Sequence, residues 1–279
     1  METEVKRTSR LGQIGIYVAK HFRIFVHEKG WSFIVFGAII SWLVAFVVGG
    51  KMFNTYENTK SGFFSIVSAG IWIGLFNSIQ TICKERSIIK YEHRTGLHMS
   101  SYVLSHVIYQ AVICLIQSIV MLIICSIYID FPEDGLIFSS CIPEYLITLF
   151  LMLLASDVMG LAISSIVRTP NAAMTVMPFV LILQLIMSGV LFSLDGISKK
   201  IATFTVSKWG MEAMGSIGDL NSLPLKITLQ YPQIQKVSNN AAYEATSEHL
   251  LKVWGIFILF TVVLTAISII SLEFIDKDK

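Results

Sequence analysis

The residues best suited to transmit force or to bind a partner gather in one charged stretch, residues 83–102, CKERSIIKYEHRTGLHMSSY. Its principal charges are Glu85, Arg86, Glu92 and Arg94. Apolar runs long enough to cross a bilayer lie directly before and after it. Because a segment this charged cannot enter hydrocarbon, we expect it to lie at the water interface between two membrane spans.

The same stretch has the spacing of a short helix followed by a turn. Gly96 is placed to end that helix in a left-handed conformation. Ser100 and Ser101 are placed to cap the following helix, which we expect to begin at Tyr102. Two interpretations are open at this point. The stretch is either a solvated connector or a helix parallel to the membrane on which a partner pushes.

Composition restricts the class of protein. The 279 residues are 54% hydrophobic and 14% charged, with a mean hydropathy of +0.69, whereas a soluble domain carries about a quarter charged residues. We therefore expect an integral membrane protein in the plasma or inner membrane. A net charge of +2 does not favour nucleic acid. The four cysteines form no CxxC pair and the six histidines are scattered, so we expect neither a disulfide framework nor a metal site.

Hydrophobic periodicity predicts an all-α membrane protein with a single domain over residues 1–279. Residues 11–29 have apolar residues at helical spacing with basic residues between them, which is typical of an interfacial helix. Six spans are predicted at 31–50, 61–82, 102–128, 143–167, 172–194 and 251–274. Residues 195–249 are too polar to span, so we expect a re-entrant hairpin there, with short strands or extended loop at 225–237.

Positive charge predicts the orientation of these spans. Lys and Arg gather in residues 1–30, in 83–101 and at the C-terminal tail, while the short loops on the other side contain only Lys51 and Lys60. Because cytoplasmic loops are enriched in Lys and Arg, we expect both termini and residues 83–101 to be cytoplasmic. The hairpin within 195–249 then faces outside.

One carboxylate falls inside a predicted span. Asp157 lies ten residues from the end of its span, about 15 Å deep at 1.5 Å per residue. A charge at that depth costs about 3 kcal/mol on insertion scales, so Asp157 should face protein or water. Possible partners are Gln80, His106, Gln110 and Gln184. A role in contacting cargo or a proton and a role in tying spans together remain equally open.

The order of these parts resembles the permease half of type-2 ABC exporters, a group that includes the eukaryotic G subfamily and its bacterial relatives. Two local patterns look like the family's coupling helix and its passage from span five into re-entrant helices. The first comprises Glu85-Arg86, Glu92-His93-Arg94, Gly96 and Tyr102, and the second comprises Ser188–Phe192, Gly196–Ser198 and Trp209–Ala213. The sequence departs from the family pattern at Tyr91, where a basic residue is commoner, and at His98, which replaces an aromatic residue.

The resemblance implies a division of labour. Residues 83–101 would be the coupling helix, in which Glu85, Arg86, Glu92, Arg94 and Gly96 meet an ABC ATP-binding subunit. The 279 residues contain no G-x-x-x-x-G-K-[ST] loop, so ATP and Mg are expected in that partner. A second permease, identical or related, would complete the path. The apolar spans weakly favour an amphipathic or lipid-like cargo. We expect no catalytic, cofactor or metal residue in this chain.

The resemblance also implies an outer gate after the fifth span. Leu191 and Phe192 suit an apolar plug across the axis between two permeases. Lys208 and Glu212 are four residues apart, a spacing that brings their charges together on a helix. Trp209 beside them would anchor the hairpin at headgroup depth.

Two other classes of function stay open. One is a membrane scaffold or sensor subunit that binds an ATPase but transports nothing. The other is an intramembrane enzyme, which would need convergent catalytic groups. One aspartate and scattered histidines are poor support for such a site.

Overall fold

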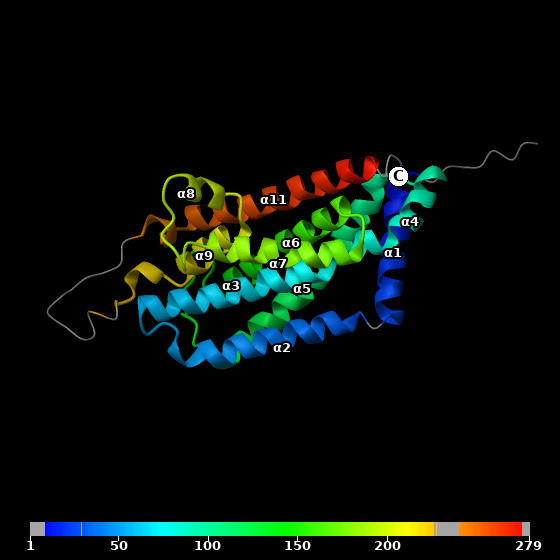
Figure 1. The fold of residues 1–279 in the computed structure, drawn as a ribbon. Helices are drawn as coiled ribbons and strands as arrows, with labels where there is room; N and C mark the ends of the chain where they lie inside the picture. The colour runs from blue at the N-terminus through cyan, green and yellow to red at the C-terminus, as the bar shows by residue number, and fades with distance from the viewer. Residues whose placement is uncertain (1–8, 29, 226, 228–239, 275–279) are drawn as a thin grey trace, which may run out of the picture.

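Long helices run side by side and build nearly all of the chain that the structure describes (Figure 1). The structure is a computed structural model that describes residues 9–28, 30–225, 227 and 240–274. No β-strand occurs in those residues. The α-helices are α1 (Arg10–His27), α2 (Trp31–Val48), α3 (Tyr56–Ser78), α4 (Thr81–Arg94), α5 (Met99–Tyr128), α6 (Cys141–Ile166), α7 (Pro170–Ile186), α8 (Ile197–Ala202), α9 (Val206–Ile217) and α11 (Ser247–Glu273). Three short 3-10 turns join them, at Gly49–Lys51, Leu220–Ser222 and Ala241–Tyr243.

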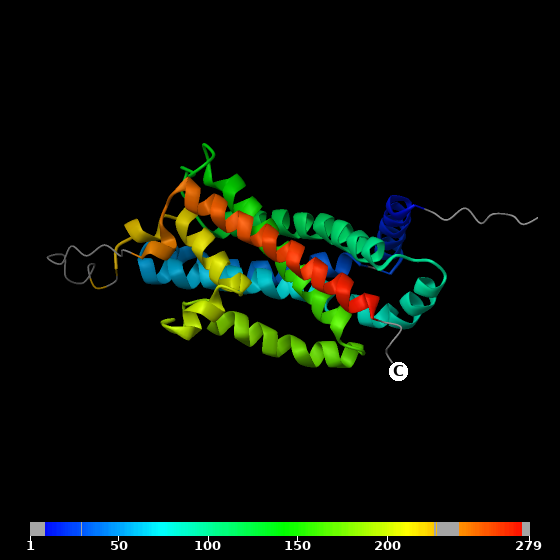
Figure 2. The same ribbon diagram turned by 90° about the horizontal axis from the view of Figure 1, so that it is seen from above.

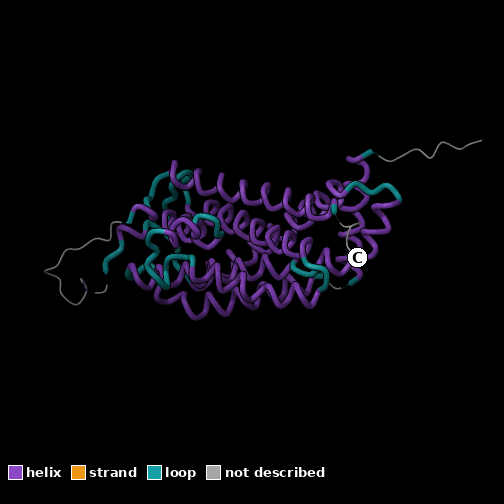
Figure 3. The backbone as a smooth tube through the Cα atoms, turned by 45° about the horizontal axis from the view of Figure 1, so that its top comes forward, coloured by secondary structure: helices purple, strands orange, loops and turns teal. Residues whose placement is uncertain are grey.

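Two ends of the bundle differ in what covers them. Helix α1 lies across one end, where α4 also lies, while α8 and α9 lie at the other end (Figures 1 and 2). The last turn of α11 is at the α1 end, so the start of α1 and the end of α11 share one side of the molecule. The tube in Figure 3 shows that the loops gather at these two ends, with uninterrupted helix between them.

Five of the described helical segments are long and apolar enough to cross a membrane. They are Trp31–Lys51, Tyr56–Arg94, Met99–Tyr128, Cys141–Ile166 and Ser247–Glu273. The predicted all-helical, multi-pass membrane protein is therefore confirmed. Helix α7 has 17 residues, about 26 Å at 1.5 Å per residue, which is shorter than a hydrocarbon core of about 30 Å. The count of six spans stays a prediction.

The two central helices, α3 and α6, approach each other through small residues. A Cβ atom on Gly74 would lie 2.6 Å from the carbonyl oxygen of Leu153, and one on Gly160 would lie 2.8 Å from the carbonyl oxygen of Leu75. Only glycine therefore fits at these positions. In a membrane, where lipid tails are as apolar as leucine, close backbone contact of this kind is a main source of helix association. The contact between α3 and α6 is the core of the bundle.

Local capping moves three of the predicted boundaries. Helix α3 begins at Tyr56, within the predicted polar loop, because Thr55 accepts a hydrogen bond from the Asn58 N–H. Helix α5 begins at Met99 with His98 as its N-cap, so the prediction that Ser100 and Ser101 cap it was wrong. Helix α7 ends at Ile186, before the predicted residue 194, because the chain turns through Gly189 at φ +74°.

Where the re-entrant hairpin is predicted, the structure has two short helices, α8 and α9. Helix α9 is buried along most of its length between α3, α6 and α11. A Cβ on its Gly210 would lie 3.0 Å from Met152 of α6 and from Val67 of α3. This enclosure agrees with the principle that a non-spanning segment enters the apolar region only where protein surrounds it. The strands predicted at 225–237 fall almost entirely outside the described residues.

The close approach of α3 and α6 predicts a large effect from one methyl group. Gly160→Ala should destabilise the protein by about 1–3 kcal/mol, because the new methyl meets backbone that cannot move aside. Gly255→Ala is the matched control, since a Cβ there meets nothing within 4 Å. Thermal unfolding in detergent measures both. Equal melting temperatures for the two variants would contradict the close contact.

Candidate functional site

Helix α4, the predicted coupling helix, is attached to α6 at its first turns. The Ser164 hydroxyl oxygen accepts hydrogen bonds from the backbone N–H groups of Ile82, at 3.0 Å, and Cys83, at 3.1 Å. The Arg86 guanidinium donates to the carbonyl oxygens of Ser165, at 3.0 Å, and Val167, at 3.1 Å. Helix ends leave N–H and C=O groups without partners. Here the start of α4 and the end of α6 satisfy each other.

The far end of α4 is attached to α1. The Tyr17 hydroxyl donates to the Glu92 carboxylate at 2.8 Å, and the Lys20 ammonium lies 3.8 Å from the same carboxylate. Burial and the adjacent Glu92 raise the pKa of Tyr17 above its usual value, so the phenol remains a donor at neutral pH. Gln13 bonds the turn after α4, donating to the Gly96 carbonyl and accepting from the His98 N–H.

Three of the predicted coupling residues form hydrogen bonds within the chain, and their role in coupling stays a prediction. Glu85 accepts from the Tyr102 hydroxyl at 3.2 Å, so Glu85, Arg86 and Glu92 bind α4 to three other helices. Arg94 is exposed. Gly96 has φ +112° just beyond the helix end, as its position predicts.

The outward side of α4 carries two residues that the sequence did not point to as coupling residues. Ile88 is 50% exposed and Tyr91 is 71% exposed. They are three residues apart and so share one helical face. The sequence feature that could have identified them is the presence of two large side chains with apolar surface on an otherwise charged helix.

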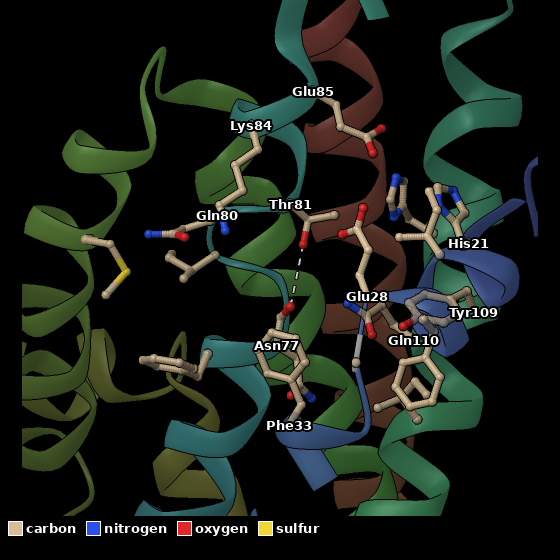
Figure 4. A pocket seen from close by; sticks show the side chains of 18 residues that line it. His21, Glu28, Phe33, Asn77, Gln80, Thr81, Lys84, Glu85, Tyr109 and Gln110 are labelled. Carbon is tan, nitrogen blue, oxygen red and sulfur yellow. Dashed lines mark hydrogen bonds between the residues drawn. The ribbon is translucent and has the colours of Figure 1, made fainter. Parts of the chain in front are cut away.

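A cavity of about 540 Å³ lies inside the α1 and α4 end of the bundle (Figure 4). Gln80 and Lys84 lie on one side of it and His21 and Tyr109 on the other, with Glu28 between them. It combines apolar rings with charged and amide groups. Among the described residues, no group of three His, Cys, Asp or Glu side chains could hold a metal ion.

His106 lies against this cavity with an unusual neighbour. Its ring centroid is 3.8 Å from that of His21, and the His21 Nε2 lies 3.2 Å from the Ser105 hydroxyl. Burial lowers the pKa of His21 to about 4, with a smaller effect from Lys20, so His21 is neutral at pH 7. Neither ring nitrogen of His106 has a hydrogen-bond partner within the described residues.

Asp157 lies within α6 and is fully buried. Its carboxylate oxygens have no hydrogen-bond partner in the part of the chain that the structure describes, and the Ser78 hydroxyl donates to its backbone carbonyl instead. Gln80, His106 and Gln110 do not bond it. Gln184 pairs elsewhere, accepting from the Ser207 N–H at 3.0 Å. A neutral acid is far less costly than a carboxylate in such a site.

The predicted gate residues form two groups: one is held by polar contacts within the chain, and the other is exposed. Lys208 and Glu212 form the expected pair at 3.3 Å. The Lys208 ammonium also lies 3.7 Å from the ring centroid of Trp209, whose indole N–H donates to the Thr203 carbonyl at 2.9 Å. Leu191 and Phe192, between α7 and α8, are 53% and 61% exposed.

These environments predict opposite results for two polar residues in spans. Asp157→Asn should leave the free energy of unfolding within about 1 kcal/mol of wild type, because no bonded partner is lost. Asn77→Leu should cost about 1–3 kcal/mol, because Asn77 exchanges two hydrogen bonds with Gln117, at 2.7 and 3.1 Å. Denaturant titration in detergent measures both. A strongly destabilised Asp157→Asn would show that the carboxyl has a partner.

Comparisons with known proteins agree with a helical membrane protein of this kind. The chain matches the family described as ABC-2 type transporter over residues 13–217, from the first turn of α1 to the last residue of α9. It is 23% identical over 234 residues to the ABC transporter ATP-binding/permease protein Rv1747 of Mycobacterium tuberculosis (strain ATCC 25618 / H37Rv). That alignment covers 77% of this chain but only 26% of the mycobacterial protein. Since the family match spans more than half of the sequence, the chain belongs to the ABC-2 type transporter membrane family and is a permease component.

Proposed function

We propose that this chain is the permease subunit of an ATP-driven ABC exporter and forms half of a dimeric translocation path. The observation that carries the proposal is the attachment of α4. Hydrogen bonds from Arg86 to the end of α6 and from Tyr17 to Glu92 hold both ends of this helix. A push on α4 would therefore move α1 and α6 with it.

A separate polypeptide is proposed to supply the ATPase. The 279 residues contain no phosphate-binding loop, whereas the mycobacterial relative is named as both ATP-binding and permease protein. The exposed face of α4, with Ile88 and Tyr91, is the proposed docking surface for the ATP-binding subunit. ATP and Mg would bind in that subunit. The enrichment of Lys and Arg at this end supports a cytoplasmic position for it.

A second permease copy, identical or related, is proposed to complete the path. Helix α7 exposes large apolar side chains, including Phe179 at 71% and Ile182 at 53%, and either lipid or another permease could cover them. We propose six membrane crossings, with α7 as the fifth, which brings both termini to the cytoplasmic side. An amphipathic or lipid-like cargo agrees with apolar helices that carry few charges.

The outer hairpin is proposed to gate the path. Lys208 and Glu212 are mostly buried, so their ion pair is screened less than an exposed pair would be. Together with the hydrogen bond between Ser207 and Gln184 it holds α9 in place. Leu191 and Phe192 remain exposed beside this fixed element, where they could meet their counterparts in a second copy. For Asp157, contact with cargo or a proton and a tie between spans both stay proposals.

The coupling role predicts different defects on the two sides of α4. Tyr91→Ala should weaken binding of the ATP-binding subunit with little effect on stability, because the side chain is exposed. Arg86→Ala and Glu92→Ala should permit binding but reduce transport per ATP hydrolysed about fivefold or more, because α4 is no longer firmly held. Pull-down, ATPase and vesicle transport assays measure these quantities, with Lys51→Ala at the other end as the control.

The same assays test the competing scaffold function. An exporter should show ATP turnover that its cargo stimulates, while a scaffold should bind the ATPase without any such response. Wild-type transport in both Arg86→Ala and Glu92→Ala would refute the coupling role. Hydrolysis of ATP by the isolated chain would refute the division between subunits.

The gate role predicts a difference between exposed and tied residues. The Phe192→Ala variant should leak cargo or show altered cargo selectivity, while its binding of the ATPase stays unchanged. Glu212→Ala should impair transport more than Lys208→Ala, because Lys208 is the more exposed of the two side chains, at 16% against 10%, and water can take its place. Cysteines at 191 and 192 should cross-link between copies only in the closed state. Cross-linking that nucleotide never alters would indicate a static cap.

A further inference from the structure

Two hollows on the same side of the molecule share part of their walls. The cavity beside α4 and a second, apolar hollow of about 200 Å³ are both lined by Phe33, Phe76 and Asn77. The first hollow lies under α1 and α4, at the end of the bundle. The second continues from it along the surface between α2 and α3. A single ligand could therefore occupy both.

The cavity offers charges of both signs. Glu28, from the end of α1, and Glu85, from α4, supply carboxylates, and Lys84 supplies an ammonium (Figure 4). Neither Glu28 nor Lys84 forms an ion pair with another described residue. The volume of about 540 Å³ falls in the range typical of small-molecule sites.

Buried polar groups also face this space. His106 is 1% exposed and has no hydrogen-bond partner at either ring nitrogen. Gln110, one helical turn further along α5, is 3% exposed and also lines the cavity. Buried polar groups usually have a partner, and an exception needs an explanation. A bound polar ligand would provide one for His106.

The groove between α2 and α3 has the opposite character. Besides Asn77, its lining is apolar, and it consists of Phe33, Phe36, Gly37, Ile40, Trp72, Ile73 and Phe76. Phe36 is 60% exposed and Trp72 is 52% exposed. The groove therefore matches an alkyl chain.

We infer that the cavity and the groove together bind one membrane phospholipid whose headgroup carries a phosphate and a primary ammonium. The ammonium lies at Glu28 and Glu85, the phosphate lies at Lys84, and one acyl chain lies in the groove against Phe36 and Trp72. Charge complementarity selects this headgroup. An anionic lipid would place its net negative charge beside two carboxylates, and a simple cation would place its positive charge beside Lys84. The site depends only on the membrane location of the helices and is independent of the ATPase and of the direction of transport.

Lipid retention by the purified chain tests the inference. The chain is stripped of lipid in detergent and titrated with phosphatidylethanolamine, with phosphatidylglycerol of the same acyl chains, or with phosphorylethanolamine alone. Native mass spectrometry then counts the molecules retained per chain. We expect one phosphatidylethanolamine bound about tenfold more tightly than phosphatidylglycerol, as loss of one charged hydrogen bond implies. Phosphorylethanolamine alone should bind far more weakly because it has no chain for the groove.

Variants separate the two halves of the site. Glu28→Gln and Lys84→Gln should each weaken retention about tenfold, whereas Glu133→Gln and Lys51→Gln, at the opposite end, should not. Ile40→Trp should block the groove, while Leu43→Trp, on α2 but outside the groove, should retain the lipid. Unchanged melting temperature and elution volume confirm that each variant is folded.

Three results would overturn the inference. The first is equal retention of phosphatidylglycerol and phosphatidylethanolamine, which would mean that the site does not distinguish between headgroups. The second is tight binding of free phosphorylethanolamine, which would assign the cavity to a soluble ligand. The third is an Ile40→Trp variant that changes the oligomeric state but retains lipid, which would assign the groove to a second copy of the chain.

Discussion

The close contact between α3 and α6 is the constraint on which the other elements depend. Glycines at positions 74 and 160 bring backbone against backbone, and burial of apolar surface from water contributes little to helix association inside lipid. Because the two helices touch this closely, Ser164 on α6 lies within reach of the first amides of α4. The orientation of α4 therefore follows from packing in the centre of the bundle. The proposed coupling surface on α4 is therefore attached directly to the core of the bundle.

Polar groups in this protein mostly act as ties between helices. The Asn77 and Gln117 amides bond each other across α3 and α5, and Trp254 of α11 donates to Thr148 of α6 at 2.9 Å. In a medium without water such pairs satisfy groups that would otherwise be costly to bury. Among the described residues, exceptions include His106, Asp157 and the Tyr145 hydroxyl, whose buried polar side-chain atoms have no hydrogen-bond partner. His106 faces a cavity, whereas Asp157 lies in the packed contact between α6 and α3, so of these two the histidine is the one open to a ligand.

Much of the fold could be predicted because a membrane helix is visible in the local sequence as a long run of apolar residues. Apolar runs located α2, α5, α6 and α11 within a few residues, and the spacing of Lys208 and Glu212 predicted their ion pair. Boundaries were less predictable where one capping group decided them. Thr55 extends α3 into a polar stretch, and Gly189 ends α7 eight residues before the apolar run ends.

The sequence by itself determined that this is a helical membrane protein, and it predicted that residues 83–101 form a charged coupling helix outside hydrocarbon. Those properties depend on composition and on contacts between near neighbours. Only the tertiary structure decided the partners of those charges. Glu92 meets Tyr17, a residue 75 positions away, and His106 meets His21 rather than Asp157. The tertiary structure also brings the cavity and the groove together, because their walls come from α1, α2, α3 and α5. The periodicity of residues within one helix does not predict how close that helix lies to another.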